Sequence, residues 1–137
     1  MLAEFDHRSA SSDQPLPPLP LGPYAPSVTA GGFVFVSAQA GVDPETGEIP
    51  PGGFEKECKQ AFRNLVQAVA SAGGSSRNIV KTTVLFTDAE LFPMVNTVYA
   101  EFFPDSPPAR TAAVVELMGN KRIAVDAIAV ATDACMP

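Results

Sequence analysis

Histidine and cysteine are scarce in this sequence. The chain of 137 residues has one histidine, His7, and two cysteines, Cys58 and Cys135. Neither cysteine has a histidine near it in the sequence, which argues against a zinc site. Two cysteines are also too few for a disulfide framework. Nucleophilic schemes that pair serine or cysteine with histidine have equally little support. Any chemistry must therefore come from arginine, tyrosine, carboxylates, amides or the backbone.

Basic residues are also few, and long apolar runs are absent. Nine lysines and arginines stand against 15 acidic residues, for a formal net charge of −6. The basic residues are scattered, whereas phosphate binding needs them clustered, so we expect no nucleic-acid partner. No apolar run approaches the ~20 residues that a helix needs to cross a bilayer. No basic stretch followed by an apolar one indicates a secretory signal. We expect a cytoplasmic protein without membrane association.

The composition changes along the N-terminal part of the chain. Residues 1–14 are mostly polar, and prolines then recur at positions 15, 17, 18 and 20. Repeated proline excludes helices and sheet ladders and favours an extended form, which is typical of an arm on a domain surface. The remaining length and the hydrophobic fraction of 46% leave room for one domain with an ordinary core. We expect an extension at 1–20, a single domain at 21–132 and a tail at 133–137.

Residue patterns predict two helices and several strands in the domain. Gly31-Gly32 between apolar runs at 27–30 and 33–38 predicts a β-hairpin. Apolar residues three and four apart predict a helix at 53–72, and a β-branched run predicts a strand at 79–87. Asp88 is a plausible cap before a helix that starts near Phe92 and runs to about 103. With two further strands, this order predicts an α+β fold, in which two helices cover one face of a mixed sheet.

The segment 107–130 holds two apolar runs on either side of residues 118–121. The Gly-Asn turn between the runs predicts a second hairpin. Arg110 opens the first run, and its guanidinium presents a fork that matches a carboxylate. Arg110 is therefore where we expect a small acid to bind. The alternative, an ion pair with a neighbouring subunit or loop, is the more common case on this stretch alone.

Both faces of the expected sheet carry apolar residues. In the run 33–39, Phe33, Phe35 and Ser37 share one face, while Val34, Val36 and Ala38 share the other. The helices cover only one face, so the other face needs a partner. We infer a homo-oligomer that buries this second face.

Several short motifs occur together in a specific order and spacing. They are Gly-Pro-Tyr at 22–24, Val-Ser-Ala-Gln at 36–39, Asp-Pro-Glu-Thr-Gly at 43–47, Ala-Gly at 72–73, Ile-Val-Lys at 79–81, Val-Asn at 95–96 with Tyr99 and Phe-Phe at 102–103, Pro-Ala-Arg at 108–110 and Ala-Ile-Ala-Val at 127–130. Together they resemble the RidA/YjgF family of reactive-intermediate deaminases. The resemblance covers roughly residues 22–131.

The resemblance implies a chorismate-mutase-like domain, assembled as a homotrimer with a central barrel and with pockets in clefts between subunits. Active members hydrolyse imines and enamines, such as 2-iminopropanoate and 2-aminoacrylate, to 2-keto acids and ammonia without a metal or organic cofactor. Arg110 matches the family arginine that binds the substrate carboxylate, and we expect Arg110 and Tyr24 to be catalytic. The residues expected to bind substrate are Ser37, Ala38, Gln39, Asn96, Thr111, Ala112, Ala124 and Asp126.

Three positions depart from the family pattern. Ala124 stands where the family has a glutamate that places water against the imine carbon, Ala112 where cysteine is common, and Ala38 where glycine is usual. A methyl group cannot activate water, so we expect weakened or altered activity. Asp126 lies two residues on, on the same strand face. Glu116 shares a face with Arg110 if its strand is regular, and is the second possible substitute.

Two functions stay open at this point. The first is an imine or enamine deaminase that is slow or uses another carboxylate. The second is a small-carboxylate-binding or repurposed relative, acting on a different substrate in a specialised biosynthetic pathway. A ribonuclease role has been attached to some relatives, but the acidic charge argues against it here.

Overall fold

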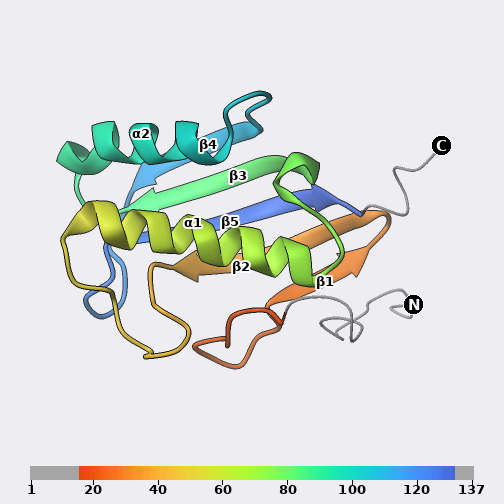
Figure 1. Cartoon of the computed structure of the whole chain (residues 1–137), viewed down its shortest axis with the longest axis horizontal. Coiled ribbons are helices and arrows are strands. Elements are labelled where there is room, and N and C mark those ends of the chain that lie inside the picture. Colours follow the sequence, from red (N-terminus) through yellow and green to blue (C-terminus); the bar gives the residue numbers. More distant parts are fainter. Residues whose placement is uncertain (1–15, 132–137) are drawn as a thin grey trace.

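The computed structural model describes residues 16–131, so the parts of the chain that hold His7 and Cys135 lie outside the described residues. A five-stranded mixed sheet has the order β1-β2-β5-β3-β4. Its strands are β1 (Ser27–Ala30), β2 (Phe33–Ala40), β3 (Ile79–Phe86), β4 (Ala109–Val114) and β5 (Ile123–Val130). Both α-helices, α1 (Phe54–Ser71) and α2 (Phe92–Phe102), lie on one face of this sheet (Figure 1). The predicted α+β class is confirmed.

The first predicted hairpin is confirmed. β1 pairs antiparallel with β2, and Ala30 lies opposite Phe33. Gly31 and Gly32 between them have φ angles of 60° and 84°, which glycine adopts without steric cost. The tight connection therefore depends on two residues without a Cβ atom.

Helix α1 buries its apolar stripe against β2 and β5. Its first turn carries Glu55 and Glu57, which suits the positive end of the helix dipole. The most deeply buried positions recur at three- and four-residue spacings and include Cys58, Ala61, Phe62, Leu65 and Val69. Burial of this stripe forms one side of the hydrophobic core, as the sequence predicts.

Helix α2 begins close to the predicted position. Asp88 caps a short 3₁₀ turn, Ala89–Leu91, where its side chain accepts a hydrogen bond from the Glu90 N–H over 2.8 Å. α2 follows directly, with proline in its first turn, where a missing N–H costs little. Within residues 16–131 no helix is long and apolar enough to span a membrane.

The predicted hairpin in segment 107–130 is wrong, because β3 lies between β4 and β5. Phe86 of β3 pairs with Val114 of β4 on one side and with Ile123 of β5 on the other. β4 runs parallel to β3, and α2 supplies the crossover that a parallel pair requires. Gly119, with a φ of 69°, turns the chain in the connection from β4 to β5. This connection passes β3 and does not close a hairpin.

The predicted alternation along β2 also fails at one place. The pairing with β5 shifts between Val36 and Gln39, so the strand contains an irregularity there. Ala38 is exposed and Gln39 is buried, the reverse of regular alternation from Val36. A bulge of this kind re-aims side chains, and here it presents Ala38 on the face away from the helices.

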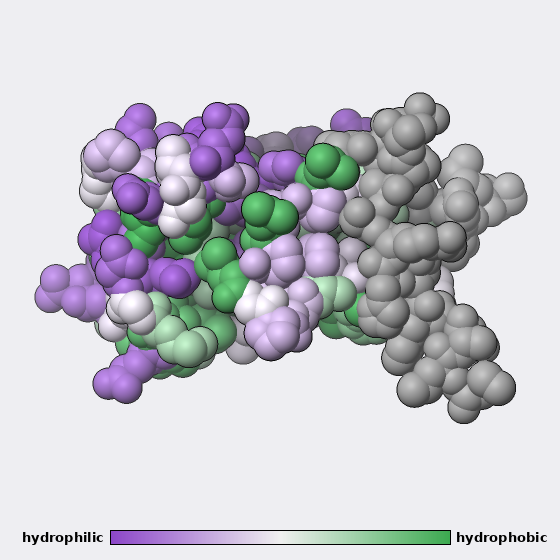
Figure 2. Space-filling model, turned by 90° about the horizontal axis from the view of Figure 1, so that it is seen from below, coloured by the Kyte–Doolittle hydropathy of each residue, from purple (hydrophilic) through white to green (hydrophobic). Residues whose placement is uncertain are grey.

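The sheet face without helices carries exposed aromatic rings. Phe33 and Phe35 are 42% and 44% exposed, and their ring centroids lie 6.4 Å apart. Hydrophobic side chains also interrupt the polar surface on the lower side of the molecule, seen face-on in Figure 2. Leu16, Leu19 and Leu21 of the proline-rich stretch are more than half exposed. The apolar surface left uncovered by the helices is therefore considerable.

Candidate functional site

Arg110 is held between β4 and α2. It pairs in register with the buried Thr82, so its side chain lies on the helix-covered face of the sheet. Its Nη1 donates a hydrogen bond to Asn96 Oδ1 over 2.9 Å. Its Cζ lies 4.8 Å from the centroid of the Tyr99 ring and 5.4 Å from that of Phe92. Two aromatic rings and one amide therefore fix the orientation of the guanidinium fork.

Tyr99 is itself anchored in the core. Its hydroxyl forms a 2.6 Å hydrogen bond with the Thr82 hydroxyl, which is fully buried. Burial raises the pKa of Tyr99, while the Thr82 hydrogen bond and the Arg110 charge oppose that rise. The ring also meets Phe62 of α1 edge-on at 5.5 Å. Tyr99 thus forms a stiff support for Arg110.

The sequence reasoning named Asn96 but missed the rest of this support. Phe92, Asn96 and Tyr99 are spaced four and three residues apart, so they share one face of α2. That spacing was visible in the sequence. The packing of Arg110 against this face was not, because the sequence pattern predicts a hairpin in segment 107–130.

An apolar hollow of about 210 Å³ lies beside Arg110. Phe92 lines the hollow and contacts the guanidinium, and Ala112 follows Arg110 by two residues on the same face of β4. Phe86 stacks on Phe92 with centroids 5.5 Å apart and planes 6° apart. The lining consists of Phe86, Ala89, Phe92, Ala112, Ala113 and Val114.

Tyr24 and the residues that end β2 form a second group. Ser37 Oγ donates to the Ala25 carbonyl over 2.7 Å, and Gln39 Nε2 donates to the Ser37 carbonyl over 3.2 Å. The Tyr24 hydroxyl accepts a hydrogen bond from the Leu21 N–H over 3.1 Å, which leaves its own proton available to a ligand.

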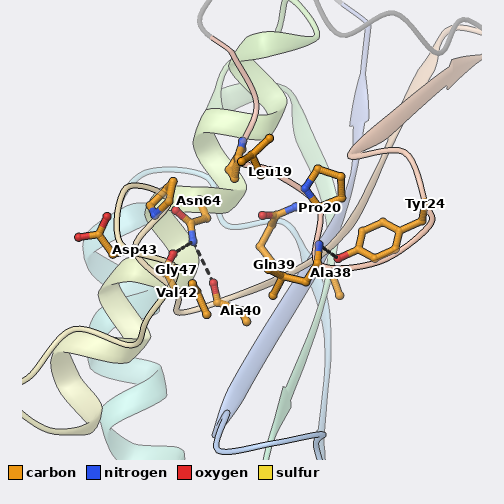
Figure 3. A pocket seen from close by; sticks show the side chains of 13 residues that line it. Leu19, Pro20, Tyr24, Ala38, Gln39, Ala40, Val42, Asp43, Gly47 and Asn64 are labelled. Carbon is orange, nitrogen blue, oxygen red and sulfur yellow. Dashed lines mark hydrogen bonds between the residues drawn. The ribbon is translucent and has the colours of Figure 1, made fainter.

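This second group borders a pocket of about 220 Å³, shown in Figure 3. Asn64 of α1 closes one side, and its Nδ2 donates to the carbonyls of Ala40 and Val42. The proline-rich stretch from Pro18 to Leu21 lines the other side. Tyr24, Ala38 and Gln39, all expected from the sequence, line this pocket, whereas Arg110 does not.

The positions of Ala124 and Asp126 form a third group on the uncovered face. In β5 the buried residues alternate with partly exposed ones, and Ala124 and Asp126 belong to the exposed set. Asp126 lies opposite Thr83, which in turn lies opposite Thr111 of β4. Thr111 is exposed, and its Oγ1 accepts a hydrogen bond from Lys81 Nζ over 3.1 Å. These residues therefore lie on the other side of the sheet from Arg110.

Glu116 does not share a regular strand with Arg110. β4 ends at Val114, and Glu116 is exposed in the connection to β5. It borders an open depression with residues of the same connection, including Asn120 and Lys121. Glu116 was expected to share a face with Arg110 only if a regular strand joined them, and β4 ends before Glu116.

One chain does not bring these three groups together. β2 and β4 are separated by β5 and β3, so three strand spacings, roughly 14 Å, lie between Ala38 and β4. Arg110 and Ala124 are on opposite faces. A site that contains Arg110, Tyr24 and the position of Ala124 would need a second copy of the chain.

An ion pair outside these groups, in which only the acidic partner is fully buried, was also missed. Glu57 is completely buried in α1, where Oε2 accepts from the Arg122 backbone N–H over 2.7 Å and Oε1 from Arg122 Nε over 2.8 Å. Gly41 leaves room for this helix turn, because a Cβ there would lie 2.1 Å from the Glu57 carbonyl oxygen. The pair ties α1 to the start of β5, a structural role.

The chain matches known proteins in sequence and in fold. The sequence model described as Endoribonuclease L-PSP matches residues 16–132. The 2-iminobutanoate/2-iminopropanoate deaminase of Mus musculus is 41% identical over 114 residues, which cover 82% of this chain and 84% of the relative. A RutC family protein of Pyrococcus abyssi is 40% identical, over 82% of this chain and 89% of its own length.

Solved structures agree with this assignment. RidA from an Antarctic Psychrobacter superposes with a TM-score of 0.81 at 31% identity, over 90% of this chain and 98% of that one. Escherichia coli TdcF with bound serine has a TM-score of 0.80 at 33% identity, with the same coverage. The mixed sheet with two helices on one face defines the fold class, and the chain belongs to the RidA/YjgF family.

Proposed function

We propose that this protein hydrolyses small 2-imino and enamine acids to 2-keto acids and ammonia, in clefts between the subunits of a homotrimer. The relatives of Mus musculus and Bos taurus, which are 41% and 40% identical to this chain, carry the name 2-iminobutanoate/2-iminopropanoate deaminase. TdcF holds serine, a ligand that carries a carboxylate. The family supports the reaction class, and the residues below support the assignment of roles.

The fixed guanidinium of Arg110 is the observation that carries this proposal. Its fork is oriented by Asn96, Tyr99 and Phe92 before any ligand arrives. A carboxylate can accept two parallel hydrogen bonds from such a fork, and pre-orientation lowers the entropy lost on binding. Arg110 therefore anchors C1 of the substrate and places C2, the imine carbon, at a defined distance from it.

The reaction itself replaces a C=N bond with a C=O bond. Water adds to C2 of 2-iminopropanoate, the nitrogen takes up a proton, and the resulting carbinolamine expels ammonia to leave pyruvate. Tyr24 has the role of a hydrogen-bond donor, because its oxygen already accepts from Leu21 N–H and its proton is free. Ser37, Ala38 and Gln39 form the wall of the same cleft from the neighbouring copy.

Ala124 reduces the rate of this hydrolysis. We assign to Ala124 the position of the family glutamate that directs water, and its methyl group neither accepts nor moves a proton. Asp126 is on the same sheet face and is the nearest replacement along the strand. Glu116 is exposed outside β4 and is the more distant candidate.

A second candidate function rests on the same alanine. A pocket that keeps the carboxylate-binding arginine and lacks the water-directing group suits a small-carboxylate-binding protein, or a repurposed relative that acts on another substrate in a specialised biosynthetic pathway. Fold alone does not choose between these functions, because function depends on the site.

The test is a coupled assay of 2-iminopropanoate hydrolysis that measures free ammonia and pyruvate. The reaction is run with the wild type, with Arg110→Ala and without enzyme, since imines hydrolyse unaided. Wild-type turnover above both controls supports the deaminase. A wild-type rate equal to the uncatalysed rate, with pyruvate binding that depends on Arg110, supports the binding protein instead.

A further inference from the structure

The apolar hollow beside Arg110 is not explained by recognition of a carboxylate. Its lining consists of two phenylalanines, three alanines and one valine, without a polar side chain. Arg110 lies next to the hollow, since its Cζ is 5.4 Å from the ring centroid of Phe92, which lines it. A charged anchor next to an apolar recess matches a ligand with a carboxylate at one end and a hydrocarbon chain at the other.

Small residues create this recess. Ala112 faces the hollow from β4, and Ala89 borders it from the turn before α2. Phe86 and Phe92, stacked in parallel, form its rigid wall. A rigid wall with small residues opposite leaves space that the protein's own side chains do not fill.

We propose that this hollow receives the side chain of the 2-imino acid and selects acids with a longer aliphatic chain over 2-iminopropanoate. The inference rests on the proposed function for the reaction, and on the hollow for the preference.

The dimensions support a side chain of several carbons. Arg110 and Ala112 are two residues apart along β4, so their Cα atoms are separated by roughly 6.6 Å. When an acid binds through C1 at Arg110, the hollow is therefore within reach of its carbons from C3 onward. The volume of about 210 Å³ is several times the roughly 30 Å³ that one water occupies in the liquid. A branched four-carbon chain fits such a space, whereas the methyl group of 2-iminopropanoate leaves most of it empty.

The test uses a series of stable 2-keto acid products, so that binding is measured without catalysis. Calorimetry compares pyruvate, 2-oxobutanoate, 2-oxopentanoate and 4-methyl-2-oxopentanoate. Each methylene that enters the hollow is expected to tighten binding about fourfold. The largest acid, 4-methyl-2-oxopentanoate, should therefore bind at least about 10-fold more tightly than pyruvate, even in a hollow that is partly open. The corresponding imino acids are then compared by kcat/KM.

Two variants fill the hollow from separate elements. Ala112→Leu fills it from β4, and Ala89→Leu fills it from the exposed turn before α2, where a larger side chain does not disturb the sheet. Both should remove the preference for the longer acids. Ala100→Leu is the matched control, because Ala100 is exposed on α2 and does not line the hollow.

The outcomes separate this inference from the proposed function. A flat series in the wild type, or a preference that survives both filling variants, overturns the hollow as a side-chain site. That result would fit occupation of the hollow by a neighbouring copy of the chain. A graded binding series that both variants abolish, without hydrolysis of any imino acid, supports the hollow and refutes the deaminase.

Discussion

Arg110 and Ala124 lie on opposite faces of the same sheet. Arg110 is in register with the buried Thr82 on the helix-covered face, whereas Ala124 alternates with the buried Ile123 and Val125 and faces away from the helices. Within one chain, a single small ligand therefore does not reach both positions. Any site that combines Arg110 with the position of Ala124 depends on how copies of the chain assemble.

Trimer formation should depend on the uncovered sheet face. Phe33 and Phe35 expose close to half of their surface there, which is costly in water. Light scattering should report a mass near three chains for the wild type, and Phe35→Glu should shift it toward one chain, because it buries an unpaired charge in the interface. Ala100→Glu, on the exposed side of α2, is the control and should remain trimeric. A monomeric wild type at micromolar concentration would contradict the prediction.

Substitution of Arg110 should weaken keto-acid binding. Arg110→Lys keeps the charge but loses the planar fork and its stacking on Tyr99, so pyruvate affinity should fall about 10-fold or more. Arg110→Ala should abolish measurable binding. Calorimetry measures the affinity, and thermal unfolding checks that both variants are folded. Wild-type affinity in Arg110→Ala would assign Arg110 to a structural role.

Ala124→Glu should accelerate the hydrolysis of 2-iminopropanoate. A positioned general base contributes about 10²–10⁴-fold, so a gain of an order of magnitude or more is expected where the new carboxylate fits beside Tyr24. The assay compares the two proteins with the reaction that lacks enzyme. If the wild type is as fast as an ordinary deaminase of the family, Ala124 is not a disabling change. Asp126→Asn and Glu116→Gln would then identify the carboxylate that replaces the glutamate.

Cys58 should be unreactive toward thiol reagents in the native protein. It is fully buried, and desolvation, with Glu57 next in effect, raises its pKa from an ordinary value of 9.0 to about 12. In a Cys135→Ser background, labelling at pH 8 should require unfolding in urea. Rapid labelling without urea would show that the core opens readily.

Ionisation of the Cys58 thiol should make the protein less stable as the pH rises. Because its pKa is higher in the folded chain, the unfolded chain loses the thiol proton first as pH rises. The contribution of Cys58 to the free energy of unfolding should be complete below pH 9 and should fall as pH rises from 9 toward 12. Urea titrations of Cys58→Ala should lack this part of the decrease. Parallel curves for the two proteins would contradict the shift.

The sequence by itself determined the local elements of this protein. Apolar residues three and four apart identified α1, the two glycines identified the turn between β1 and β2, and Asp88 marked the region where α2 begins. These features depend on residues that are close in the chain, where spacing and backbone preference act directly. The order and spacing of the motifs also sufficed to indicate the family, because they required no knowledge of which strands pair.

Only the tertiary structure decided which distant segments meet. The insertion of β3 between β4 and β5 depends on the α2 crossover, and two apolar runs joined by a Gly-Asn turn carry no information about a third strand. The irregularity in β2 moves Ala38 to the uncovered face, and the Arg122 pair permits Glu57 to be buried. Each outcome reflects the need to satisfy hydrogen bonds and charges across the whole domain, which a local pattern does not record.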